Sequence, residues 1–193
     1  MTPQAVLAQT LKLPNGVVIK NRLLKSAMSE ALGTRAGAPT PELTHLYQAW
    51  AEGGIGLCVT GNVMIDHGAL GEPGNVVIAD DRDLPALKEW AKAATANKTQ
   101  CWVQLNHPGK QAPKGLNKGG TVSPSAVPFR SDMAAFFATP RELTDAEVRA
   151  LVKRFGDAAK VVKKAGFSGV QIHGAHGYLV SQFLSPHHNV RTD

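Results

Sequence analysis

The sequence predicts an α/β protein in which parallel strands alternate with helices. Short apolar runs recur along the chain, and each is nearly continuous, as in a strand buried on both faces. Stretches with helical spacing separate these runs. The predicted strands cover residues 23–26, 55–60, 100–105 and 169–173. This β-α-β-α-β-α-β order requires parallel pairing with right-handed crossovers, and it leaves a barrel and a doubly wound sheet as alternatives.

Capping residues mark the first two helices. The first helix is predicted to begin after Thr40, with Pro41 in its first turn, and to end near Gly53 and Gly54. The second is predicted over residues 83–97, where apolar residues share one helical face. Each of these helices leads into the next strand, as a crossover should.

The third helix has the strongest signals. Thr144 and Glu147 form a capping box at its start, and Gly166 follows its last turn. Its apolar face is predicted from residues at helical spacing, namely Val148, Leu151, Val152, Phe155, Ala159 and Val162.

Two further segments have a predicted place relative to the strands. The Asn-Gly dipeptide at 15–16 lies between apolar runs and predicts an N-terminal β-hairpin, which would cover one end of a barrel. Residues 107–143 form a long Gly- and Pro-rich excursion after the third strand. Long βα loops at the carboxyl ends of strands usually shape a substrate pocket.

Composition and length indicate one globular folding unit over residues 1–193. Hydrophobic residues make up 43% of the chain and charged residues 19%, which argues against disorder. No segment has the roughly 18 uninterrupted apolar residues of a membrane span, and the N-terminus lacks the pattern of a secretion signal. We therefore expect a cytoplasmic protein that does not engage a membrane. Cys58 and Cys101 lie in predicted strands, which favours buried reduced thiols.

The formal net charge of +6 does not indicate a nucleic-acid partner. Lysines and arginines are dispersed, and the densest runs, 110–118 and 160–164, have no recognition motif beside them. A solvated helix face explains the second run.

Three polar rings follow the fourth predicted strand. His173 ends the strand, and His176 and Tyr178 come within the next five residues. Because ligands of parallel α/β proteins bind at the carboxyl ends of the strands, this cluster indicates a functional site. The residues between the rings are small, which allows a ligand to approach the backbone closely, although a tight turn has the same pattern.

A zinc site is the rival interpretation of these histidines. His173 and His176 lie three residues apart, and His187 and His188 follow downstream. No carboxylate or cysteine stands at helical spacing beside them, so the pattern favours a site for an organic ligand, without a metal.

Several motifs occur in the order of a known family. The chain contains HGAHGYL, QFLSP and NVRTD after the fourth predicted strand, preceded by NRLLKSAMS, EGGIGLCVTGNVMID, QLNHPGKQA and PSAVP. Together these segments resemble the old yellow enzyme family of NADH:flavin oxidoreductases. The resemblance covers nearly the whole chain.

The resemblance implies a (β/α)8 TIM barrel that carries FMN. A complete barrel takes about 250 residues or more, so 193 residues correspond to about the first four βα units with the N-terminal hairpin. We therefore expect the C-terminal half of the barrel to be absent. An arginine near the flavin and the loops that hold the FMN phosphate belong to that half in the family, so FMN binding and turnover are expected to be impaired.

The resemblance also implies roles for individual residues in cofactor binding. Gln104 would bind the pyrimidine edge of the flavin. The residues bordering the flavin would be Ser26, Ala27, Met28, Ser29 and Gly61. One branch of the family has a cysteine where this chain has Ser29, and a hydroxyl cannot act as a redox-tuning thiol.

For catalysis, the resemblance implies reduction of activated C=C bonds in enones and nitroalkenes, with NADH or NADPH as the reductant. His173 and His176 would bind the oxygen of the electron-poor substrate, and Tyr178 would be the proton donor. The alternative is a non-catalytic half-barrel module that self-associates into a homo-oligomer or binds a partner through its open face.

Overall fold

A four-stranded parallel sheet forms the centre of the protein, whose computed structural model describes residues 2–193. The strands are β3 (Leu24–Lys25), β4 (Leu57–Met64), β5 (Gln100–Asn106) and β8 (Gly169–Ile172), and they lie in this order across the sheet. Each neighbouring pair is parallel. The four predicted strands are confirmed, although β4 runs to Met64, beyond its predicted end at residue 60.

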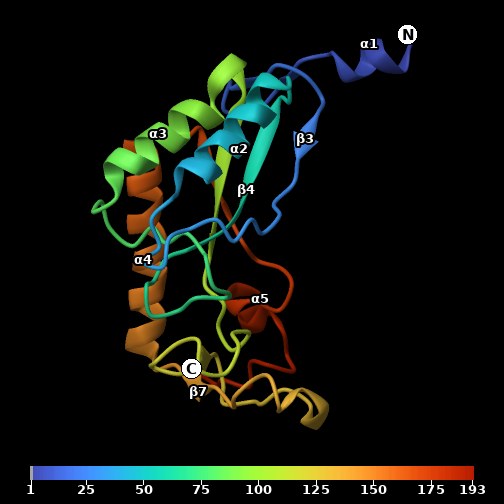
Figure 1. Cartoon of the computed structure of the whole chain (residues 1–193). Helices are drawn as coiled ribbons and strands as arrows, with labels where there is room; N and C mark the ends of the chain where they lie inside the picture. The colour runs from blue at the N-terminus through green and yellow to red at the C-terminus, as the bar shows by residue number, and fades with distance from the viewer. Residues whose placement is uncertain (1) are drawn as a thin grey trace.

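The strand order decides between the two predicted architectures. Right-handed crossovers between strands in sequential order place every helix on the same face of the sheet. The helices α2 (Pro41–Glu52), α3 (Leu84–Ala94) and α4 (Asp145–Ala165) accordingly pack side by side on one face (Figure 1). This is the arrangement of a barrel wall. The sheet of the described residues is nevertheless open, and it does not close into a barrel.

Local capping explains where the helices begin and end. The Thr40 hydroxyl accepts a hydrogen bond from the Leu43 N–H at the start of α2, and the predicted capping box opens α4. The prediction for α3 was too long. After Ala94 the chain turns into a short 3₁₀ segment, η1 (Ala96–Lys98), because Asn97 adopts a left-handed backbone with a φ of 52°. No helix of residues 2–193 has both the length and the apolarity needed to cross a membrane.

The hydrophobic core lies between the three helices and the sheet, with Trp90 at its centre. The Trp90 ring meets Tyr47 of α2 edge-to-face at 5.2 Å and Phe167 at 5.1 Å, both between ring centroids. Cys58 and Cys101 are buried free thiols at facing positions of β4 and β5, as predicted.

The apolar face predicted for α4 is wider than the face that α4 buries. Leu151 and Val162 are buried, but Val152 is 69% exposed. Val152 belongs to an apolar groove of 390 Å³ that α4 forms with Ile172 of β8 and Phe183. Helical spacing correctly identified the apolar side of α4, but it does not say how much of that side a neighbour covers.

The N-terminal segment covers the amino-terminal end of the sheet. The hairpin predicted around Asn15 and Gly16 is confirmed, with β1 (Leu11–Lys12) paired antiparallel to β2 (Val18–Ile19). The Lys20 ammonium then donates to the Asn97 carbonyl at 2.5 Å, just before β5. A short helix before the hairpin, α1 (Pro3–Leu7), was not predicted.

The excursion at 107–143 lies at the opposite end, beside the C-terminus in Figure 1. It contains three elements that were not predicted, namely β6 (Val122–Ser123), η2 (Ser131–Met133) and β7 (Arg141–Glu142). Strands of two residues carry too little pattern to be recognised in a sequence. Lys110, which belongs to the basic run at 110–118, is only 1% exposed, and its ammonium donates to the Val127 carbonyl at 2.8 Å. Part of this run is therefore internal.

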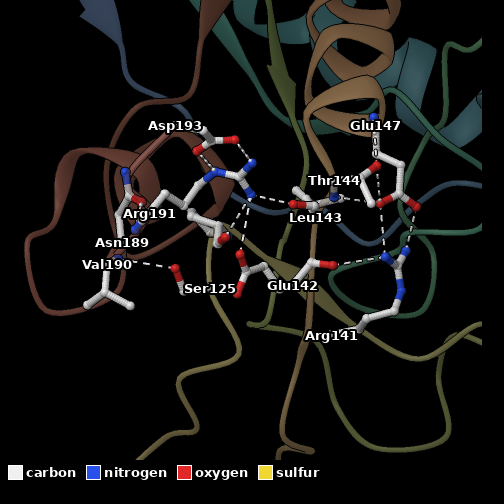
Figure 2. A network of polar contacts seen from close by, with 11 residues as sticks. Ser125, Arg141, Glu142, Leu143, Thr144, Glu147, Asn189, Val190, Arg191 and Asp193 are labelled. Carbon is white, nitrogen blue, oxygen red and sulfur yellow. Dashed lines mark hydrogen bonds and ion pairs between the residues drawn. The ribbon is translucent and has the colours of Figure 1, made fainter.

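Arg191 connects the end of the chain to the excursion and to the start of α4 (Figure 2). Its guanidinium donates to the carbonyl oxygens of Leu143 and Pro124, the second at 3.1 Å. Beside it, Arg141 of β7 forms an ion pair with Glu147 at 2.7 Å. Together these contacts fix the excursion relative to α4.

The capping box gives a direct test of this part of the fold. We expect Thr144→Ala to lower the free energy of unfolding by about 1 kcal/mol, because the Glu147 N–H loses its acceptor at the start of α4. Urea denaturation followed by circular dichroism measures the change. Thr139→Ala is the matched control, because Thr139 is exposed in the loop before β7. Equal stability of the two variants would contradict the assignment of Thr144 as the residue that caps α4.

Candidate functional site

A cavity of 190 Å³ lies at the carboxyl ends of the strands. Its walls come from the segment after β3, from β4 and β5, from the segment after β4, and from the turn after β8. The lining residues are Ala27, Met28, Ser29, Asn62, Glu72, Gln104, His173, His176 and Tyr178. All the predicted site residues except Ser26 and Gly61 are among them. The structure thus brings together residues from distant parts of the sequence.

The turn after β8 gathers the three rings that the sequence singled out. The His173 ring centroid lies 5.2 Å from that of His176 and 4.9 Å from that of Tyr178, both edge-to-face. The chain can turn this sharply because His176 and Gly177 adopt left-handed backbones, with φ of 57° and 73°. A left-handed histidine is uncommon and strained, and such residues occur preferentially at functional sites.

A backbone hydrogen bond orients the His173 ring. The Ala175 N–H donates to His173 Nδ1 at 3.3 Å, so Nδ1 acts as an acceptor and the proton of the neutral ring is assigned to Nε2. Burial, and then the neighbouring His176, lower the pKa of His173. His173 is therefore a neutral imidazole at neutral pH, with one N–H available as a donor.

The surroundings of Tyr178 keep its phenol protonated. Burial raises the pKa of Tyr178, and the Glu72 carboxylate raises it further because a nearby negative charge disfavours the phenolate. The same carboxylate accepts a hydrogen bond from the Ser29 hydroxyl. Glu72 was not predicted as a site residue, because it lies in an irregular segment after β4 where the sequence has no periodic pattern.

Gln104 of β5 lines the cavity. Its backbone N–H donates to the Thr60 hydroxyl at 2.9 Å, and its side-chain amide donates to Gln171 Oε1 at 2.8 Å. Gln171 is the parallel partner of Gln104 on β8. The signal for Gln171 was present in the sequence, as a polar residue between Val170 and Ile172 in the run that predicts β8.

Two predicted residues have other positions. Ser26 is exposed directly after β3 and does not line the cavity. Gly61 was expected after the second strand but lies within β4. Its N–H donates to Glu30 Oε1 at 3.1 Å, and a Cβ at this position would collide with the Met28 carbonyl oxygen. Gly61 therefore lets the segment after β3 approach β4, and so shapes the cavity from behind.

The four histidines at 173, 176, 187 and 188 lie in two separate pairs. Within residues 2–193 no three His, Cys, Asp or Glu side chains gather around a point where a metal ion could bind. The His187 and His188 rings meet edge-to-face with centroids 4.7 Å apart, and His188 Nδ1 lies 2.9 Å from the Lys110 ammonium. His188 therefore contacts the excursion.

The chain is similar in sequence to proteins of one family. The sequence model of the NADH:flavin oxidoreductase / NADH oxidase family matches residues 7–193. The NADH-dependent flavin oxidoreductase iliE of Hypocrea jecorina is 36% identical over 92% of this chain and 48% of its own length. For iccE of Talaromyces variabilis the identity is 37%, over 97% of this chain and 49% of its own length. The chain spans about half the length of these curated relatives.

Solved structures agree with the sequence comparison. The old yellow enzyme from Trypanosoma cruzi superposes with a TM-score of 0.86 and 27% identity, over 98% of this chain and 56% of its own. The old yellow enzyme homologue from Zymomonas mobilis gives a TM-score of 0.86 and 28% identity, over 97% of this chain and 53% of its own.

The Glu72 carboxylate can be tested through the titration of Tyr178. We expect Glu72→Gln to lower the pKa of the Tyr178 phenol, since a neutral amide no longer opposes the phenolate charge. The protein has only two tyrosines, and burial raises the pKa of Tyr47 well above the ordinary range. The first phenolate to appear in an ultraviolet absorbance titration is therefore that of Tyr178.

The matched control is Glu52→Gln, because Glu52 is exposed at the end of α2. A Tyr178 pKa that stays unchanged in Glu72→Gln would show that Glu72 has no influence on the phenol.

Proposed function

Because the chain belongs to the NADH:flavin oxidoreductase / NADH oxidase family, we propose that it carries the substrate-activating residues of an FMN-dependent reductase of activated C=C bonds. Membership of the family implies FMN as the cofactor and NADH or NADPH as the reductant. The observation that supports the proposal is the gathering of His173, His176 and Tyr178 in one cavity with Gln104.

The cavity fits the flat ring of a flavin in its chemistry. Gln104, whose side-chain amide donates to Gln171, supplies a polar group suited to the pyrimidine edge. Ala27 and Met28 supply an apolar surface on another side, where the Met28 side chain is 54% exposed. When bound, FMN supplies hydride-transfer chemistry, while the protein orients and tunes it.

The histidines would activate the substrate. When the β-carbon of an enone or nitroalkene is reduced, negative charge grows on the substrate oxygen. Hydrogen-bond donors held in place before the reaction stabilise such charge at no reorganisation cost. His173 and His176 would be these donors, and the Ala175 N–H keeps the His173 ring oriented for the task.

Tyr178 would complete the reduction by giving its proton to the α-carbon. Its raised pKa means that the phenol is protonated at neutral pH and so available as a general acid. The product then carries one additional hydrogen on each of the two former alkene carbons. Enones and nitroalkenes are the substrates that need this pairing of an oxygen site with a proton donor.

Tyr178→Phe tests the assignment. With excess FMN and NADH, we expect this variant to reduce 2-cyclohexenone at least about 10²-fold more slowly than the unmodified chain, because general acid catalysis is lost. Reduction of the flavin by NADH should stay unchanged, since it needs no phenol. His187→Asn is the control, as His187 meets His188 edge-to-face and does not line the cavity. Absence of enone reduction by the unmodified chain would refute the proposed function.

We further propose that the 193-residue chain binds FMN weakly on its own. It spans about half the length of its curated relatives, and its sheet is open at β3 and β8. Titrating FMN into the purified chain and following quenching of flavin fluorescence measures the affinity. Stoichiometric retention of FMN through gel filtration would contradict weak binding.

A second candidate function is supported by the apolar groove along α4 and β8. An open sheet edge next to an apolar surface favours self-association. In this alternative the chain is a non-catalytic half-barrel module. A colourless, stable homo-oligomer that stays inactive with added FMN would favour it over the reductase.

A further inference from the structure

A second and larger cavity lies next to the candidate site. Its volume is 590 Å³, within the range of about 300–1,000 Å³ of small-molecule sites. The irregular segment after β4 contributes to both cavities, since Glu72 lines the site while Leu70 and Asn75 line this one. We call it the Arg35 cavity, after the arginine in its wall.

The Arg35 cavity has a cationic residue, Arg35, but no anionic one among its lining residues. Arg35 and His67 are its only ionisable lining residues, and no acidic residue lines it. Among the residues that the structure describes, no carboxylate lies within ion-pair distance of Arg35. The nearby Asp66 and Asp80 are engaged with Arg154 and Arg82. The guanidinium is thus a donor without an internal acceptor.

Hydrogen bonds hold the walls of the Arg35 cavity in place. The Gly33 N–H donates to the Gly74 carbonyl at 2.7 Å, which connects the segment before α2 to the segment after β4. The Asn117 side chain accepts from the Leu70 N–H at 2.8 Å and donates to the Leu70 carbonyl at 2.9 Å. The three wall segments are therefore fixed relative to one another, and a ligand would meet a site that is already formed.

Gly37 lets two of these walls approach closely. It has a φ of 89°, and a Cβ there would lie 2.8 Å from Val77 Cγ2 and 3.5 Å from His67 Cε1. The close approach brings the His67 ring against the turn that carries Arg35. A histidine ring can donate a hydrogen bond in either tautomer, so His67 adds a second side-chain donor to the lining of this cavity.

We propose that the Arg35 cavity binds a small organic anion. Its phosphate or carboxylate oxygens would accept hydrogen bonds from Arg35 and His67, since a guanidinium matches the geometry of both groups. Its apolar body would lie against Leu70, Val77 and Leu116, which line the same cavity. The proposal does not depend on the proposed reductase function, because it uses none of the residues assigned to the flavin or the alkene.

Isothermal titration calorimetry with two probes tests the proposal. Phenyl phosphate and phenylacetate combine an apolar ring with the two anionic groups, and 2-phenylethanol is the uncharged control. We expect at least one anion to bind, and 2-phenylethanol to bind at least about tenfold more weakly, as loss of a charge-assisted hydrogen bond implies. The two anions also tell a phosphate site from a carboxylate site.

Variants locate the binding. We expect Arg35→Gln to lower the affinity for the anion about tenfold or more. The matched control Arg22→Gln should leave the affinity unchanged, because Arg22 is exposed at the amino-terminal end of the sheet. Circular dichroism serves to check that both variants are folded. The proposal is overturned if neither anion binds, or if affinity falls in His176→Asn but not in Arg35→Gln, which would move the anion into the neighbouring site.

Discussion

The parallel pairing of β5 with β8 is the contact on which the candidate site depends. Trp102 pairs with Gly169, and Gln104 pairs with Gln171. Gly169 is needed here, because a Cβ would lie 2.8 Å from the Trp102 ring. A slip of one residue would turn every β8 side chain to the other face of the sheet. The glycine therefore fixes the register that puts Gln171 beside Gln104 and delivers His173 to the end of the strand.

Burial of the residues that follow β8 determines the protonation states in the site. The turn after β8 brings the His176 and Tyr178 rings against His173, which is buried, while Tyr178 is half-buried. Burial favours the neutral form of His173 and of Tyr178. A neutral His173 and a protonated Tyr178 are both hydrogen-bond donors, so a cavity built from such groups is suited to a ligand that carries or develops negative charge on oxygen.

Sequence patterns predicted the parts of the fold that depend on local chemistry. Continuous apolar runs located the strands, and Thr144 with Glu147 located the start of α4. They did not predict features set by partners distant in the chain. The sequence predicted that the strand ends before Gly61, yet pairing with β5 extends β4 beyond this residue. Glu72 has no pattern around it, and only the folded chain brings it to Tyr178.

The exposure of Val152 likewise depends on contacts between distant parts of the chain, which local sequence patterns do not predict. The edge strands β3 and β8 each have one unpaired side, and Leu24 and Ile172 on them are 57% and 47% exposed. The matched old yellow enzyme structures contain nearly as much chain again as the part that superposes here. Burying such apolar surface gives about 25 cal/mol per Å². The rims of the sheet would therefore gain stability from any further strands that pair with them, whereas the residues around His173 are already assembled without such strands.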